Sequence, residues 1–180
     1  NAAFGRPGSA HSRLERAEAL VMDAMTATIL VIGLGNPILG DDGVGWCVVR
    51  RLAQRLVGDE RVEVDCLSVG GLSLMERMLG YRHVILVDAI DTGRSPQGTI
   101  RVFDLNSLDN PALGHSTSAH DASLKTALAT AKAMGGDVPD QVDIVSVEAR
   151  VGLDFTESLT YPIAAAVSGA CDHVLALINP

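Results

Sequence analysis

The sequence has few aromatic residues, few basic residues and no long apolar run, and each shortage excludes a class of function. Aromatic residues make up only 3% of the 180 residues, too few for a platform that stacks nucleic-acid bases. Lys and Arg total 14 against 22 Asp and Glu, so the net charge is −8, which argues against binding to a phosphate backbone. No uninterrupted apolar run is long enough for a transmembrane helix. We therefore expect neither a nucleic-acid partner nor a membrane partner.

Cysteine is also scarce, with three residues at positions 47, 66 and 171. Their number is odd, and no two are close enough in sequence for a CxxC metal motif. The spacing predicts that Cys47, Cys66 and Cys171 are small buried thiols rather than a disulfide framework or a zinc site. Unpaired thiols are typical of a reducing compartment, so we expect a cytoplasmic protein.

What the sequence does have is enough aliphatic residues for a core. Hydrophobic residues make up 47% of the chain, and 180 residues suffice for one domain. Residues 1–27 lack an ordered hydrophobic pattern and contain no secretory signal, and we expect an N-terminal appendage that is flexible or partly helical. Residues 28–180 are predicted to form a single α/β domain.

Short apolar runs alternate with segments of helical periodicity along this domain. Wholly apolar, β-branched runs are typical of strands buried on both faces. Strands are expected at 28–32, 62–67, 83–88, 99–103 and 142–147, and helices at 44–56, 72–79, 119–134 and 156–177, the last broken near Pro162. The segment 106–118 has the composition of a loop, and 99–103 reads as a hairpin return from the strand before it. The pattern predicts a three-layer α/β sandwich with a twisted, mostly parallel five-stranded sheet, one antiparallel strand and helices on both faces.

A glycine-rich turn follows the first predicted strand and contains two adjacent acids, Asp41 and Asp42. Its spacing differs from that of a dinucleotide-binding loop, two carboxylates would repel a pyrophosphate, and no phosphate-binding Lys follows. One acid is expected to cap the helix that begins at Val44. Two acids exceed what a cap needs, so the other is a candidate for binding a cation or for proton chemistry.

Two further candidates lie where elements of the predicted sheet and helices meet. Asp88 ends an apolar strand, where it is either a turn former or a carboxylate that needs a cation. His120 opens a helix after a polar loop, with His115 as the alternative, whereas His83 and His173 are expected to be structural or on the surface. An imidazole and two carboxylates at one edge of a sheet suit zinc, nickel or a similar ion and leave coordination positions open, as metal-assisted hydrolysis requires.

Several stretches of the sequence resemble the hydrogenase maturation protease family, and the resemblance extends from about residue 28 to the C-terminus. The matching stretches are GLGN at 33–36, GDDGVG at 40–45, the Gly-Gly step at 70–71, ILVDA at 85–89 and SAH at 118–120. The resemblance implies an endopeptidase that removes the C-terminal extension of the nickel–iron hydrogenase large subunit. The family's metal-binding acid in the glycine-rich loop matches Asp42, its strand-end aspartate matches Asp88, and its histidine matches His120.

In that family these three residues are thought to bind the nickel already loaded into the precursor, so that only a filled subunit is cut. The resemblance thus implies that nickel is presented by the substrate, with zinc or cadmium able to replace it in a crystal, and that the partner is the large subunit precursor. We expect the protein to be a monomer. The attacking water is activated either by the metal or by an aspartate. No Ser–His–Asp or Cys–His motif supports a covalent route.

Two alternatives belong to other classes of protein. The stretch IGLGNP at 32–37 is similar to peptidyl-tRNA hydrolase, but the catalytic string of that enzyme is absent, and an acidic chain suits tRNA poorly. A non-catalytic nickel-binding module or chaperone of hydrogenase assembly would bind metal without cleaving a precursor.

Overall fold

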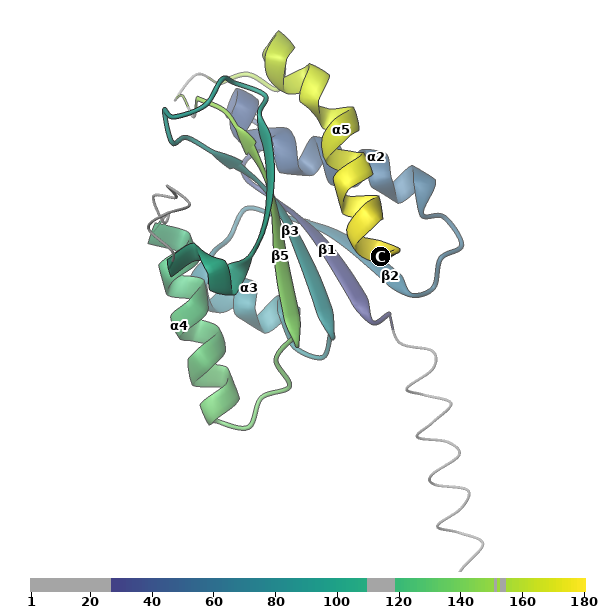
Figure 1. Ribbon diagram of the computed structural model, residues 1–180, viewed down its shortest axis with the longest axis vertical. Coiled ribbons are helices and arrows are strands. Elements are labelled where there is room, and N and C mark those ends of the chain that lie inside the picture. Colours follow the sequence, from purple (N-terminus) through teal and green to yellow (C-terminus); the bar gives the residue numbers. More distant parts are fainter. Residues whose placement is uncertain (1–26, 110–118, 151, 153–154) are drawn as a thin grey trace, which may run out of the picture.

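A computed structural model describes residues 27–109, 119–150, 152 and 155–180, with the backbone alone at 108–109 and 119–123. Strands and helices alternate along this part of the chain (Figure 1). The elements in order are β1 (Ile29–Leu34), the 3-10 helix η1 (Gly40–Gly43), α2 (Val44–Arg55), β2 (Val62–Leu67), α3 (Gly71–Met78), β3 (His83–Ile90), β4 (Ile100–Asp104), the 3-10 helix η2 (Leu105–Asp109), α4 (Ala119–Ala133), β5 (Gln141–Glu148) and α5 (Tyr161–Ile178).

The strands form one sheet in the order β2-β1-β3-β5-β4. β2, β1, β3 and β5 are parallel, and β4 pairs antiparallel with β5. The mostly parallel five-stranded sheet with one antiparallel strand is therefore confirmed. The expected hairpin is wrong: β4 does not pair with β3, because the later strand β5 lies between them and bonds to both.

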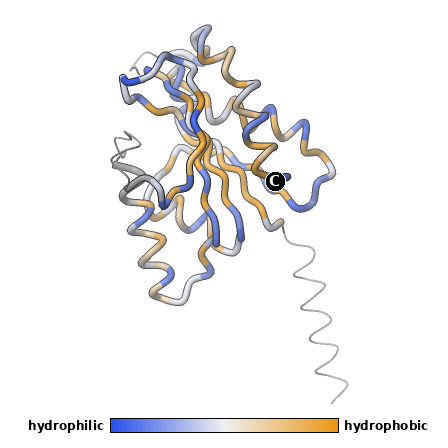
Figure 2. The backbone as a smooth tube through the Cα atoms, viewed as in Figure 1, coloured by the Kyte–Doolittle hydropathy of each residue, from blue (hydrophilic) through white to orange (hydrophobic). Residues whose placement is uncertain are grey.

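Helices cover both faces of the sheet and complete the three layers. α2 and α5 lie on one face, and α3 and α4 lie on the other (Figure 1). The central strands are largely apolar where they cross the middle of the molecule (Figure 2). Alternate residues of each strand feed the two cores: Ile85 and Val87 of β3 belong to the core under α2 and α5, whereas Val84 and Leu86 belong to the core under α3 and α4.

The C-terminal helix α5 begins later than its sequence pattern suggested. It starts at Tyr161 with Pro162 in its first turn, so the proline begins the helix and does not break it. By length and a mean hydropathy of 1.4, α5 is able to span a membrane. Its buried residues, Ile163, Ala170 and Val174 among them, instead pack in the core beside α2, which is the packing of a core helix.

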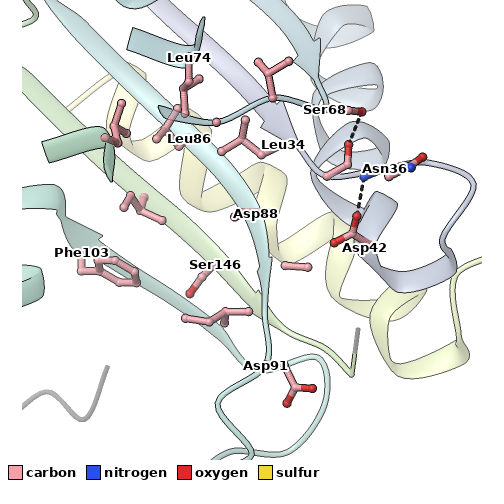
Figure 3. Close-up of a pocket in the computed structure, with 17 residues that line it drawn as sticks. Leu34, Asn36, Asp42, Ser68, Leu74, Leu86, Asp88, Asp91, Phe103 and Ser146 are labelled. Atoms are coloured by element: carbon pink, nitrogen blue, oxygen red, sulfur yellow. Dashed lines mark hydrogen bonds between the residues drawn. The ribbon is translucent and has the colours of Figure 1, made fainter. Parts of the chain in front are cut away.

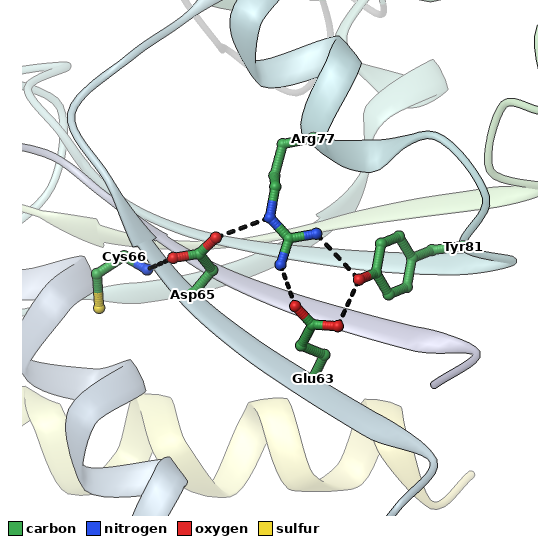
Figure 4. Close-up of polar contacts among 5 residues, drawn as sticks. All are labelled: Glu63, Asp65, Cys66, Arg77 and Tyr81. Carbon is green, nitrogen blue, oxygen red and sulfur yellow. Dashed lines mark hydrogen bonds and ion pairs between the residues drawn. The ribbon is translucent and has the colours of Figure 1, made fainter. Parts of the chain in front are cut away.

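Side-chain contacts tie the edge strand β2 to α3 (Figure 4). The guanidinium of Arg77 on α3 donates from Nε to Asp65 Oδ2 at 2.7 Å, and it also pairs with Glu63. Tyr81 accepts a hydrogen bond from Arg77 and donates one to Glu63 Oε2 at 2.6 Å. These contacts connect an edge strand, which has a sheet partner on one side only, to the helix above it.

Three smaller predictions concern the segment after β4, the N-terminal appendage and His83. The segment after β4, expected to be a loop from residue 106, begins with the 3-10 helix η2, started by a hydrogen bond from the Asn106 N–H to Asp104 Oδ1 at 2.6 Å. Residues 110–118, including His115, lie outside the described residues, as does nearly all of the predicted N-terminal appendage, 1–27. His83 is structural as expected, because its Nε2 lies 2.8 Å from Asp143 Oδ2.

Candidate active site

A pocket of about 500 Å³ opens at the carboxyl ends of β1, β3 and β5, on the face covered by α3 and α4. This is the edge at which α/β sheets bind ligands. Its floor is apolar, made by side chains that include Leu34, Leu86, Phe103 and Ile144. The charged side chains that line it are three aspartates, Asp42, Asp88 and Asp91, and its described lining contains no Lys or Arg (Figure 3). The charged groups of the described lining are therefore all acidic.

Asp42 lies in η1 and is held in place by the backbone of the glycine-rich turn. Its Oδ2 accepts a hydrogen bond from the Asn36 N–H at 2.6 Å (Figure 3). The turn can pass this close because Gly35 has a φ of +113° and a Cβ at that residue would lie 1.8 Å from the Asp42 carbonyl oxygen. Glycine is thus required at position 35, and its role is to bring η1 against the end of β1.

The neighbouring acid, Asp41, has a different partner from the one predicted. Neither acid caps α2, because the N-cap position of that helix is occupied by Gly43, which has no side chain to accept a capping hydrogen bond. Asp41 is 7% exposed and accepts hydrogen bonds from the Thr160 N–H at 2.7 Å and the Thr160 hydroxyl at 2.8 Å. These hydrogen bonds join η1 to the start of α5. Adjacent residues of a tight helical turn point in different directions, so Asp42 lines the pocket and Asp41 does not.

Asp88 lies within β3 rather than at its end, because the strand continues for two residues to Ile90. It lines the same pocket as Asp42 and is partly buried. On β3 it continues the row of Val84 and Leu86, whose side chains face α3 and α4. The structure thus brings together two carboxylates that lie far apart in the sequence.

His120, the third predicted residue, lies in the first turn of α4, and its side chain is outside the described part of the structure. Leu124, four residues later, lines the pocket and is 2% exposed. Among the described side chains no group of three His, Cys, Asp or Glu residues is close enough to share a metal ion. The described residues thus contain two of the three predicted ligands, and the convergence with His120 stays a prediction.

Ser146 on β5 was not among the predicted residues, yet it lines the pocket beside these acids. It is 2% exposed, and its Oγ has no hydrogen-bond partner among the described residues. The sequence carries one weak signal for it, since Ser146 is a hydroxyl within the apolar run 144–147. That run predicts only that the serine is buried. It does not predict that the side chain lines the pocket.

None of the three cysteines lines the pocket. Burial raises the pKa of each thiol, so the thiolate that would act as a nucleophile is disfavoured. Cys171 is fully buried as predicted, whereas Cys47 and Cys66 are only partly buried and pack at the margin of the core. The three thiols are therefore structural and contribute no group to the described lining of the pocket.

Fold and pocket together define the class: an α/β protein with an acidic site at the carboxyl edge of its sheet. A family model described as hydrogenase maturation protease matches residues 47–177. The hydrogenase 2 maturation protease of Escherichia coli K12 is 30% identical over 157 residues, which cover 84% of this chain and 90% of that protein.

Solved structures agree with the sequence comparison. The solution structure of an endopeptidase from Escherichia coli superposes with a TM-score of 0.68 at 30% identity, covering 82% of this chain and 90% of the other. The crystal structure of a hydrogenase 2 maturation peptidase from the Thaumarchaeota archaeon SCGC_AB-539-E09 gives 0.59 at 27% identity, covering 84% and 97%. This chain belongs to the hydrogenase maturation protease family, and its class of activity is peptide-bond hydrolysis.

Proposed function

We propose that this protein is an endopeptidase that removes the C-terminal extension of a nickel–iron hydrogenase large subunit precursor, and that it recognises the nickel already bound in that precursor. The observation that carries the proposal is that Asp42 and Asp88, far apart in the sequence, line one pocket. Two carboxylates that line one pocket are suited to holding a cation between them.

The third ligand in this proposal is His120. Its position in α4 supports the role: residues four apart share one face of a helix, and Leu124 lies on the face that borders the pocket. One imidazole and two carboxylates suit nickel, and zinc or cadmium would occupy the same set of ligands in a crystal. Since three protein ligands leave coordination positions open, the nickel can keep its own ligands from the precursor while it contacts the protease.

Cleavage adds water across a peptide bond of the bound precursor: hydroxide goes to the carbonyl carbon and a proton to the departing nitrogen. Two routes to the attacking water fit the site. The substrate's nickel polarises the carbonyl or the water, or one of the aspartates takes the proton from the water. In both routes the nickel places the scissile bond beside Asp42 and Asp88, so a precursor without nickel is cut slowly or not at all.

The proposal also includes the partner of the protease, its compartment and its oligomeric state. The partner is the large subunit precursor, and the three free cysteines accord with a reducing, cytoplasmic compartment. The acidic pocket disfavours a tRNA substrate, as in peptidyl-tRNA hydrolase. We propose that the protease acts as a monomer.

Mass spectrometry of the precursor, incubated with the protein in the presence and absence of bound nickel, tests the proposal. We expect loss of one discrete C-terminal peptide only from the nickel-loaded precursor, and at least a hundredfold slower loss with Asp42→Asn, Asp88→Asn or His120→Ala. Matched controls are Asp140→Asn, an exposed acid just before the amino end of β5, and His173→Ala, an exposed histidine on α5; both are expected to cleave at the wild-type rate.

Three results would overturn the proposal. Equal cleavage of nickel-free precursor would remove the recognition role of the metal. Binding of nickel-loaded precursor without any cleavage would indicate the non-catalytic nickel chaperone instead. Normal cleavage by His120→Ala together with inactivity of His115→Ala would show that the histidine is assigned wrongly.

A further inference from the structure

The hydroxyl of Ser146 is a buried polar group without a partner. The residue is 2% exposed, and within the described part of the chain Oγ neither donates nor accepts a hydrogen bond. Among the buried side-chain nitrogen and oxygen atoms of that part, Ser146 Oγ is the one left unsatisfied. Buried polar groups in folded proteins nearly always have partners, so an unsatisfied group that lines a pocket points to a partner that arrives with the ligand.

The sheet fixes where this hydroxyl lies relative to the acids. In the parallel pairing of β3 and β5, Ser146 is directly opposite Asp88. Paired residues of neighbouring strands project from the same face, and the strands lie about 4.8 Å apart, so the two side chains are neighbours. Ile144, two residues earlier on β5, also lines the pocket, and it pairs with Phe103 of β4 on the other side. Figure 3 shows Ser146 among these side chains.

The chemistry of the pocket indicates what such a partner is. A carboxylate only accepts hydrogen bonds, and the aliphatic and aromatic side chains around Asp42 and Asp88 neither donate nor accept them. A serine hydroxyl is uncharged and can donate. A substrate polypeptide brings backbone carbonyl oxygens, which are acceptors that the carboxylates cannot satisfy. Ser146 is therefore suited to a neutral acceptor next to Asp88.

We propose that the Ser146 hydroxyl donates a hydrogen bond to a backbone carbonyl oxygen of the substrate polypeptide and so holds the chain beside Asp88. This rests on the proposed function, in which the pocket receives the precursor. Ser146 is a substrate-binding residue in this account and not a nucleophile: it contributes to the affinity for the polypeptide and leaves the chemical step to the other groups of the site.

Ser146→Ala tests the proposal, with Ser146→Thr as the variant that keeps a hydroxyl. One lost hydrogen bond predicts that the dissociation constant of labelled, nickel-loaded precursor, measured by rapid mixing before cleavage, rises by about 3- to 10-fold. KM is expected to rise with it, while kcat stays within about twofold. The Tm of the free protein should be unchanged or higher, because the alanine removes a polar group that had no partner. Ser146→Thr should restore the dissociation constant.

Thr130→Ala is the matched control. Its hydroxyl is exposed on α4 and donates to the Thr126 carbonyl oxygen at 2.8 Å, away from the pocket, so the dissociation constant should not change. The inference is overturned if Ser146→Ala binds the precursor as wild type does, if its Tm falls, or if kcat falls while the dissociation constant holds. Ser146→Thr that folds but fails to restore binding also contradicts it.

Failure of this inference is distinguishable from failure of the proposed function. Wild-type protein that binds the precursor without cutting it refutes the proposed function, while the binding comparison still decides the role of Ser146. Wild-type protein that cuts the precursor, with unchanged binding by Ser146→Ala, refutes only the role of Ser146. Wild-type protein that does not bind the precursor refutes both.

Discussion

The two adjacent acids of η1 are predicted to have separable roles, stability for Asp41 and activity for Asp42. Asp41 accepts two hydrogen bonds from Thr160, from the N–H at 2.7 Å and from the hydroxyl at 2.8 Å, and it is 7% exposed. Its partner residue is exposed, so water can replace the lost acceptor in part. Asp42 accepts one backbone hydrogen bond and lines the pocket.

The loss of folding stability expected for Asp41→Ala follows from these hydrogen bonds. Hydrogen bonds to a charged group contribute about 1.5–3 kcal/mol each. Allowing for solvation of exposed Thr160, we expect Asp41→Ala to lower the free energy of unfolding by about 3 kcal/mol. For a domain of this size that corresponds to a fall in Tm of about 6–12 °C. Asp42→Asn keeps an acceptor for the Asn36 N–H, so it should cost less than about 1 kcal/mol of stability while it abolishes cleavage.

Urea denaturation and precursor cleavage, measured on both variants, give the comparison. A double-mutant cycle of Asp41→Ala with Thr160→Ala should show a coupling energy of about 1 kcal/mol, the contribution of the hydroxyl contact. The reasoning is refuted if Asp41→Ala is as stable as wild type, or if Asp42→Asn destabilises the fold as much as Asp41→Ala does.

Three further predictions concern the turn, the edge strand and the thiols. Gly35→Ala should reduce cleavage at least tenfold by displacing η1, because its Cβ would overlap the Asp42 carbonyl; cleavage at the wild-type rate would contradict this. Arg77→Ala should lower the free energy of unfolding by about 1–2 kcal/mol in urea titration, and Arg77→Lys should not restore it, since an ammonium lacks the planar fork. The raised pKa values of the Cys47, Cys66 and Cys171 thiols predict that iodoacetamide at pH 8 alkylates the native protein more slowly than the urea-unfolded protein. Mass spectrometry identifies the modified cysteines, and equal rates of alkylation would disprove the prediction.

Local patterns predicted those parts of the fold that depend on local physics. Apolar β-branched runs correctly placed β1, β3 and β5, and the alternation in 62–67 gave the half-buried edge strand β2. The partner of β4 could not be read in the same way, because β5 follows it by many residues and strand order depends on the packing of the whole sheet. Pro162 was misread for a related reason: the same residue breaks a helix interior and favours a first turn, and only the helix start decides between them.

In the candidate site, too, some residues were predictable from the sequence and others were not. The acids at the edge of the sheet were predictable because strand ends in parallel sheets meet at one edge, and Asp42 and Asp88 do share a pocket. The partner of Asp41 was not, since Thr160 is 119 residues away in sequence. Ser146 was missed because an unsatisfied hydroxyl is recognised only when every possible neighbour is known.

The central claim is that Asp42, Asp88 and His120 bind one and the same metal ion. Anomalous scattering from a crystal of the protein grown with cadmium or nickel tests it directly. The account predicts one ion in the pocket, bound by a carboxylate oxygen of Asp42, a carboxylate oxygen of Asp88 and the imidazole of His120. An ion bound elsewhere, or bound in the pocket by His115 or without either aspartate, would contradict it.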